Sequence, residues 1–424
     1  MQIIKYPEKT DWKKICRRPA IDLSAIEAAV VNILREVKEN GDQAVKRFTG
    51  MFDKVSVDDM QVSQQEMKEA ATLLSPELKQ AIEQAKRNIE SFHARQLTPD
   101  EVVETVPGVR CWRRNVAIEK VGLYIPGGTA PLFSTLLMLA VPARLAGCKE
   151  IVLCSPANKE KKIHPAILYA AQLTGVAKIY KAGGVQAIGA MAYGTETIPQ
   201  VYKVFGPGNQ YVTCAKLLIQ KDGVPIDMPA GPSEVAVYAD DTANPCFVAA
   251  DLLSQAEHGS DSQVMLVCTT ESMVDLVTAE LDKQLADLPR KQYAEQALEN
   301  SRAVLVRNEG EALNLLNEYA AEHLILSCRN AEALAEKVIN AGSVFLGHFS
   351  PESVGDYASG TNHTLPTNGY AKAYSGVSVD SFLKKITFQQ LTEEGLRNIG
   401  PAVELMAEAE GLLAHKRAVT LRLQ

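Results

Sequence analysis

The stretch EIVLCSPANKEKKIHPAILYAAQLTGVAKIY, residues 150–180, has an apolar segment at each end and a helix signal between them. The segments 150–154 and 177–181 have the length of buried strands, and the run 164–174 has the length and apolar character of a helix. Strands that alternate with helices pair in parallel, because each helix carries the chain back to the same end of the sheet. The stretch therefore predicts an α/β fold.

The same alternation continues on both sides. A first set of strands is predicted near 116–124, 150–154, 177–181, 201–205 and 234–238, and a second set near 263–268, 302–307, 324–328 and 343–346. Two sets imply two Rossmann-like domains with parallel sheets and a central cleft. We expect an N-terminal helical segment at 1–107, partly packed on the second α/β domain, then domains at 108–235 and 236–380, and a C-terminal helical tail at 381–424.

The composition limits the classes of partner. The chain has 424 residues, 46% of them hydrophobic and 22% charged, which is typical of a globular protein. Its net charge is −7 and its Lys and Arg residues are scattered, so we expect neither nucleic acid nor an anionic membrane surface as a partner. The eight cysteines form no C-x-x-C pair, which argues against a zinc ribbon or a disulfide framework.

No targeting segment is expected. The N-terminal residues 1–9 lack the apolar run of a signal peptide, and we predict a cytoplasmic protein. The uncharged stretch 121–143 is long enough to span a membrane, but it contains Pro126, Pro131 and Pro142. These prolines break it into a strand, a turn and a helix of a buried core.

Polar residues of catalytic type occur in four separate places. The segment 251–259 predicts the end of an apolar helix, with Gln255 and His258 one turn apart on the same face. Alone, such a pair is more commonly a solvated surface feature. Further on, Glu322-His323 stands before an apolar strand and offers a carboxylate and an imidazole for acid–base work, although a satisfied edge pair is the alternative.

The remaining groups lie in a polar loop and near the end of the chain. The loop holds Asp356 and His363, and His415 follows in the tail. Asp356 and His415, together with Gln255 and His258, form a plausible nitrogen and oxygen set for zinc. Spacing alone does not show that they converge.

Four glycine turns punctuate the first α/β domain, at 122–128, 183–186, 206–209 and 231–233. Turns that lead into helices suit phosphate, because backbone N–H groups and the helix dipole meet there. None is the G-x-G-x-x-G fingerprint. The turns are compatible with a nucleotide site and equally with a tightly wound fold.

Read together, seven segments resemble the histidinol dehydrogenase family. They are GLYIPGG at 122, FGPGN at 205, DMPAGPSE at 227, DLLSQAEHG at 251, EHLI at 322, SPESVGDYASGTNHTLPT at 350 and AHKRAVTLR at 414. The resemblance covers essentially the whole chain. It implies a homodimeric enzyme, with one zinc per subunit, that oxidises L-histidinol through the aldehyde to L-histidine with two NAD, the last steps of histidine biosynthesis.

The resemblance also implies roles for individual residues. The zinc ligands would be Gln255, His258, Asp356 and His415, with His415 supplied by the other subunit. The NAD contacts would be Tyr124, Gln186 and Asn209, which makes 108–235 the NAD-binding domain. The substrate would be held by Ser233, Gln255, His258, His323, Asp356, His363, Glu410 and His415.

Glu322 and His323 would be the catalytic pair. His323 would take the alcohol proton as hydride leaves for the nicotinamide, and Glu322 would activate the water that hydrates the aldehyde. No cysteine adjoins the pair, so activated water is favoured over a thiohemiacetal. Zinc would act mainly as a clamp on the substrate.

Two alternatives stay open: oxidation of a related amino alcohol or small polar diol, and a zinc hydrolase in which Glu322 activates water. A non-catalytic nucleotide-binding scaffold is disfavoured, because it would need no Glu322-His323 pair.

Overall fold

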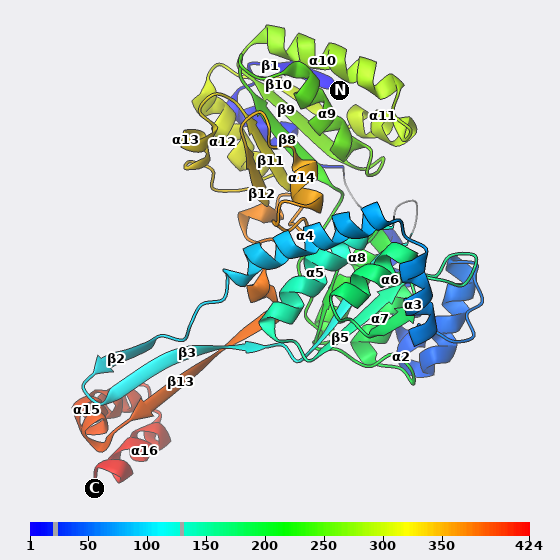
Figure 1. Ribbon diagram of the computed structural model, residues 1–424. Helices are drawn as coiled ribbons and strands as arrows, with labels where there is room; N and C mark the ends of the chain where they lie inside the picture. The colour runs from blue at the N-terminus through cyan, green and yellow to red at the C-terminus, as the bar shows by residue number, and fades with distance from the viewer. Residues whose placement is uncertain (20–23, 128–130) are drawn as a thin grey trace.

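The computed structural model describes residues 1–19, 24–127 and 131–424, and in these ranges the strands form three sheets (Figure 1). Two of them are parallel sheets with helices around them, and the third is a long antiparallel ribbon. The prediction of an α/β fold with parallel sheets is confirmed. Among the described residues, no helix is both long and apolar enough to cross a membrane.

The first parallel sheet has the order β6-β5-β4-β7. Its strands are β4 (Lys120–Tyr124), β5 (Glu150–Ser155), β6 (Lys178–Lys181) and β7 (Lys203–Phe205), and its helices are α5 (Phe133–Ala146), α6 (Pro165–Leu173), α7 (Gly184–Tyr193) and α8 (Gln210–Lys221). In chain order this is 3-2-1-4, the order of the first four strands of a Rossmann sheet. The order of the chain reverses between β4 and β7, where such folds open a crevice for ligands at the carboxyl ends of the strands.

The second parallel sheet has the order β1-β10-β9-β8-β11-β12. Its strands are β1 (Gln2–Lys5), β8 (Glu234–Ala239), β9 (Gln263–Cys268), β10 (Arg302–Leu305), β11 (His323–Ser327) and β12 (Ser343–Leu346). Its helices are α9 (Pro245–Ala256), α10 (Glu271–Ala286), α11 (Lys291–Glu299), α12 (Glu309–Tyr319), α13 (Ala331–Ala335) and α14 (Glu352–Tyr357). The strands β8, β9 and β11 are buried on both faces, as their continuous apolar sequences require.

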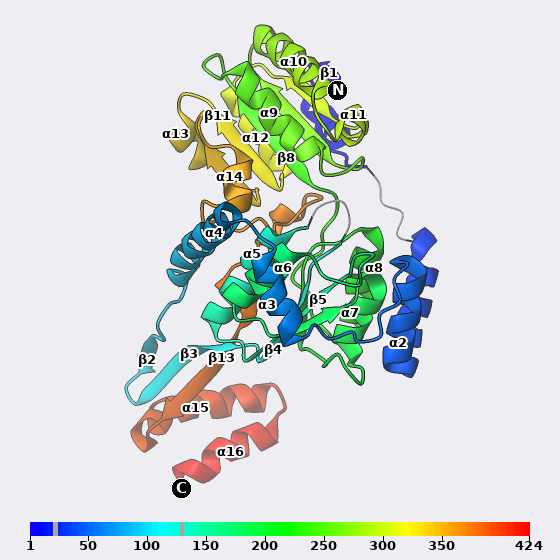
Figure 2. The ribbon, with the colours of Figure 1, turned by 45° about the vertical axis from the view of Figure 1, so that its right-hand side comes forward.

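The N-terminal residues divide between the two sheets. β1 extends the second sheet, and α1 (Trp12–Ile15) packs into its core. The helices α2 (Ser24–Phe52), α3 (Gln64–Thr72) and α4 (Pro76–Ala94) lie instead on the helices of the first sheet (Figure 2). The start of α3 carries a capping box between Ser63 and Glu66.

The antiparallel ribbon consists of β2 (Val102–Val106), β3 (Val109–Ala117) and β13 (Leu383–Leu391). It carries α15 (Glu393–Ala409) and α16 (Leu413–Leu423) at its far end, away from both parallel sheets (Figures 1 and 2). At its near end the Phe382 ring stacks on Phe205 of the first sheet, with ring centroids 4.1 Å apart. We call the ribbon and its two helices the arm.

Three expectations about the secondary structure are wrong: two concern predicted strands and one concerns the C-terminal tail. The predicted strand 116–124 is two strands, of which β3 belongs to the arm and β4 to the first sheet. The strand near 234–238 was assigned to the first set, but β8 pairs with β9 and β11 in the second sheet. The helical tail at 381–424 begins with β13, whose partner β3 lies far back in the sequence, so no local pattern reveals the pairing.

Candidate active site

The two parallel sheets present opposite ends to the polar residues. Tyr124 closes β4 and Gly206 follows β7, so the first sheet contributes the carboxyl ends of its strands. His323 opens β11 and Ser233 precedes β8, so the second sheet contributes its amino ends. Chain segments from these ends line a cavity of about 170 Å³, which we call the polar cavity.

The carboxylate of Glu322 is held at the start of β8. Its Oε2 accepts the Glu234 N–H at 2.9 Å and lies 3.4 Å from the donor Nε2 of Gln255. The residue is only 7% exposed. Burial raises the pKa of Glu322 to about 8, because the nearby His323 only partly offsets the loss of hydration.

The His323 ring lies between β8 and α14. Its Nδ1 is 3.3 Å from the Glu234 carbonyl oxygen, and its Nε2 is 3.3 Å from Oδ1 of Asp356. Burial favours the neutral ring, but the carboxylates of Glu322, Asp356 and Glu352 outweigh it and raise the pKa of His323 to about 10. The ring is thus surrounded by negative charge that favours its protonated form.

Buried oxygen atoms of the polar cavity without a hydrogen-bond partner among the described residues include Gln255 Oε1 and Asp356 Oδ1. The Nε2 atom of Gln255 donates to the Glu234 carbonyl at 3.3 Å, which leaves Oε1 free. Unpaired buried acceptors are costly, so a cation is the ligand that this pair of oxygens fits. Asp356 is suited to it, since the imidazoles around it lower its pKa although burial opposes the ionised carboxylate.

His258 completes this donor set within the chain. It lines the same cavity just after the end of α9, and desolvation lowers the pKa of its ring. A neutral imidazole with an amide and a carboxylate oxygen is a donor set that suits zinc. Within the described ranges, no group of three or more His, Cys, Asp or Glu is arranged to hold a metal ion.

Ser233 and His363 also line the polar cavity. Both ring nitrogens of His363 have partners: Nδ1 lies 2.8 Å from the Asp356 carbonyl oxygen, and Nε2 lies 2.9 Å from Oγ1 of Thr135. Burial lowers the pKa of His363. The ring therefore ties the Asp356 segment to α5 of the first sheet.

A second and larger cavity, of about 840 Å³, opens at the carboxyl end of the first sheet. We call it the large cavity. It is lined by all three predicted cofactor residues: Tyr124, Gln186 and Asn209. The glycine turn beside it runs from Gly122 to Gly128, and Gly128 lies outside the described residues.

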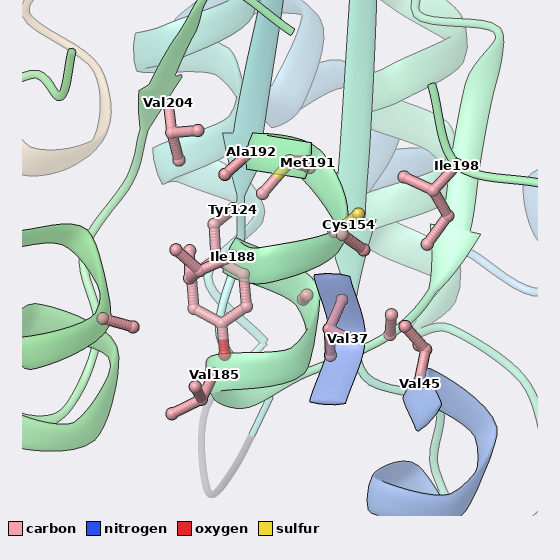
Figure 3. Close-up of a cluster of buried hydrophobic side chains, with 14 of the residues drawn as sticks. Val37, Val45, Tyr124, Cys154, Val185, Ile188, Met191, Ala192, Ile198 and Val204 are labelled. Carbon is pink, nitrogen blue, oxygen red and sulfur yellow. The ribbon is translucent and has the colours of Figure 1, made fainter. Parts of the chain in front are cut away.

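The three residues contribute different groups to the large cavity. Tyr124 accepts the Gly184 N–H on its hydroxyl, and Figure 3 shows its ring beside Ile188 with the hydroxyl near Val185 at the start of α7. Gln186 is 1% exposed, and neither polar atom of its side chain has a partner among the described residues. Asn209 caps α8 with Oδ1, so its amide nitrogen remains for a ligand.

The structure does not bring Glu410 and His415 to either cavity. Both are exposed near the turn between α15 and α16, at the far end of the arm (Figure 1). Within a single chain they are thus separated from the other predicted site residues.

Two buried ion pairs that support the site escaped prediction. Arg18 holds Glu234 through both carboxylate oxygens, at 3.0 and 2.9 Å, and so fixes the start of β8. Lys216 pairs with Asp227 at 2.5 Å, and the two hold the backbone of Gly206 beside the polar cavity. A lone Lys in a helix and a lone Arg near the N-terminus carry no local signal of such contacts.

Known proteins resemble the chain along its whole length. The family model described as histidinol dehydrogenase matches residues 16–423. A histidinol dehydrogenase of Bacteroides thetaiotaomicron is 61% identical over 100% of this chain and 99% of its own, and a chloroplastic one of Oryza sativa is 55% identical over 96% of this chain and 86% of its own. The crystal structure of histidinol dehydrogenase from Elizabethkingia anophelis has a TM-score of 0.98 at 55% identity, over 100% of this chain and 98% of that one.

The raised pKa values of Glu322 and His323 predict how stability depends on pH in metal-free protein. In the folded state both groups bind protons more tightly than at their ordinary values of 4.5 and 6.5. The folded state therefore holds more protons than the unfolded state from about pH 5 to pH 10, and stability falls as the pH rises through that window. Glu322→Gln should flatten this fall, since it removes one of the two groups and the charge that shifts the other.

Urea unfolding of chelator-treated protein, measured between pH 6 and pH 9, checks this. Glu336→Gln, on the surface beyond α13, is the control and should keep the full pH dependence. A wild-type protein whose stability rises with pH over this range would contradict the assignment.

Proposed function

The chain belongs to the histidinol dehydrogenase family, and from that membership we propose that its polar cavity performs the NAD-dependent oxidation of L-histidinol to L-histidine. The observation that carries the proposal is the buried Glu322-His323 pair beside two unpartnered oxygens, Gln255 Oε1 and Asp356 Oδ1. An acid–base pair and a cation-binding set in one cavity suit the oxidation of a polar alcohol, because the base takes the hydroxyl proton and the cation orients the substrate. The large cavity supplies room for the dinucleotide.

In the first oxidation, His323 accepts the proton of the substrate hydroxyl. The carbon–hydrogen bond breaks as the hydride moves to the nicotinamide, and the aldehyde forms. The accepting atom is the ring nitrogen Nε2. It lies close to Asp356 but makes no well-aligned hydrogen bond, so it is free to take the proton. With a cation held at Asp356, part of the negative charge that raises the His323 pKa would be offset, and the ring would then act as a base near neutral pH.

In the second oxidation, Glu322 acts as the base that takes a proton from water. The hydroxide adds to the aldehyde carbon and gives the singly deprotonated hydrate, which transfers a hydride to a second NAD and becomes the carboxylic acid. The acid then releases its proton to solvent and leaves as the carboxylate. Burial gives Glu322 a pKa of about 8, which makes it a stronger base than an exposed carboxylate. The hydrogen bond that the Glu234 N–H donates to Glu322 keeps the carboxylate in place for this step.

Gln255, His258 and Asp356 would hold zinc. A bound zinc would supply a fixed positive charge that grips the imidazole and amine of the substrate and orients them. Ser233 and His363 line the same cavity and would fix the substrate's position, with His363 acting through its bond to Thr135. Tyr124, Gln186 and Asn209 would contact NAD in the large cavity.

A second copy of the chain would complete the site with His415 and Glu410. Both residues are exposed at the end of the arm, and the helices that carry them also expose Leu405, Met406, Leu413 and Leu421 by 56 to 68%. Such apolar exposure on a projecting element is typical of a surface that another chain covers. The zinc hydrolase alternative leaves the large cavity and its three polar residues without a role.

Glu322→Gln separates the two oxidations. The variant should slow the oxidation of supplied L-histidinaldehyde by about 10²-fold or more, the usual contribution of a general base. It should slow the oxidation of L-histidinol to the aldehyde level much less, because His323 serves that step. Single-turnover NADH formation from each substrate measures the two effects, and equal slowing of both would contradict the role given to Glu322.

Mixed dimers test whether His415 crosses between subunits. His415→Asn and Gln255→Ala should each be inactive alone, but a heterodimer would combine the two intact residues in one of its sites. Random re-association should restore about one quarter of wild-type activity, since half of the dimers are then heterodimers with one intact site. Mixing His415→Asn with a His415→Asn, Gln255→Ala double variant is the control, and should restore nothing. Lack of recovery in the first mixture would place His415 in its own subunit's site.

A further inference from the structure

The large cavity has one carboxylate among its described lining residues, that of Asp53. Asp53 follows the last residue of α2, beside Phe52, which also lines the cavity. Its Oδ2 is buried without a hydrogen-bond partner among the described residues. An ionised oxygen in this state is costly unless a ligand donates to it.

Asp53 lies against the start of α7, and a helix start is a place where backbone N–H groups and the helix dipole favour anions. A Cβ built on Gly183 would stand 3.2 Å from Asp53 Oδ2, so the carboxylate lies beside the first residues of the helix. The Gly184 N–H is already bound to the Tyr124 hydroxyl at 3.0 Å. A phosphate at this helix start would therefore meet a negative charge and lose a donor.

The cations of the large cavity do not offset this charge. Lys162 is directed to Glu69, 3.6 Å away, and is half exposed. The Nδ1 atom of His164 accepts the Ala166 N–H, and burial lowers the pKa of its ring, so the imidazole is neutral. The wall beside Asp53 thus offers acceptors and the uncharged amide of Gln186.

We propose that Asp53 binds the ribose hydroxyls of the adenosine half of NAD and thereby excludes the 2′-phosphate of NADP. The inference rests on the proposed function, because it assigns the large cavity to the dinucleotide. A diol donates two hydrogen bonds to a carboxylate, whereas a 2′-phosphate would bring two more negative charges against it. Asp53 would then do from the end of α2 what an acidic residue does after the second strand of other Rossmann folds.

The pKa of Asp53 agrees with this role. Burial raises it to about 6, because no neighbouring group compensates for the lost hydration. The carboxylate is still ionised in neutral solution, so it is charged and short of a donor when the dinucleotide arrives.

Direct binding to the full-length wild-type protein and to Asp53→Asn tests the proposal. Calorimetric titration with NAD and with NADP gives the ratio of the two dissociation constants. In wild type NAD should bind at least about tenfold more tightly than NADP, and in Asp53→Asn this preference should shrink by about tenfold, since the repelling charge is gone. Asp58→Asn removes an exposed charge on the same part of the chain and should leave the ratio unchanged.

A third ligand identifies the group that Asp53 binds. Nicotinamide hypoxanthine dinucleotide keeps the ribose but lacks the adenine amino group, so wild type should bind it about as well as NAD. A large loss of affinity that disappears in Asp53→Asn would assign the carboxylate to the adenine amine and overturn the ribose assignment.

Thermal unfolding should show Asp53→Asn at least as stable as wild type, because it removes an unpaired buried charge. If Asn does not fit at position 53, Asp53→Ser also removes the charge, and the ratio of the NADP and NAD dissociation constants can be measured in that variant.

Two results would contradict the proposal in different ways. If wild type binds NAD but Asp53→Asn keeps the same preference over NADP, the role of Asp53 is wrong and the proposed function stands. If wild type shows no saturable binding of NAD or NADH, the proposed function fails together with the inference.

Discussion

The direction of one side-chain amide determines the chemistry of the polar cavity. Gln255 Nε2 donates to the carbonyl of Glu234 and lies within reach of Glu322, so the amide oxygen must point the other way. That oxygen is buried and has no partner among the described residues, and the same cavity is lined by Asp356, whose Oδ1 is also unpartnered. Gln255 Nε2 also lies 3.1 Å from His323 Nδ1, so the same amide contacts both members of the acid–base pair. A cation site and an acid–base pair therefore arise from one hydrogen-bonding arrangement.

The way the two sheets meet determines which strand ends line each cavity. Rossmann-like sheets bind ligands where the chain order reverses at the carboxyl ends of the strands, and the first sheet follows that rule with the large cavity. The second sheet contributes the opposite ends of β8 and β11 to the polar cavity. The buried pair of Lys216 and Asp227 holds the backbone of Gly206 where the first sheet reaches the polar cavity.

Much of this could be predicted from the sequence because the signals are local. Apolar runs and helix starts gave most elements of the parallel sheets, and Glu322 and His323 are neighbours in the chain. The sheet that receives β8 could not be predicted, since pairing with β11 is a contact over long sequence separation. The arm escaped for the same reason: β13 alternates polar and apolar residues only weakly and pairs with β3. Asp53, Arg18 and Lys216 carry no pattern at all, because burial and partner distance alone distinguish them from surface charges.

The central claim is that this cavity oxidises one substrate twice, from the alcohol through the aldehyde to the carboxylate. The most direct measurement is the NADH absorbance of purified, zinc-loaded protein given limiting L-histidinol and excess NAD. The account predicts two NADH for each histidinol consumed, with L-histidine as the product. One NADH for each histidinol, with aldehyde left in solution, would contradict it.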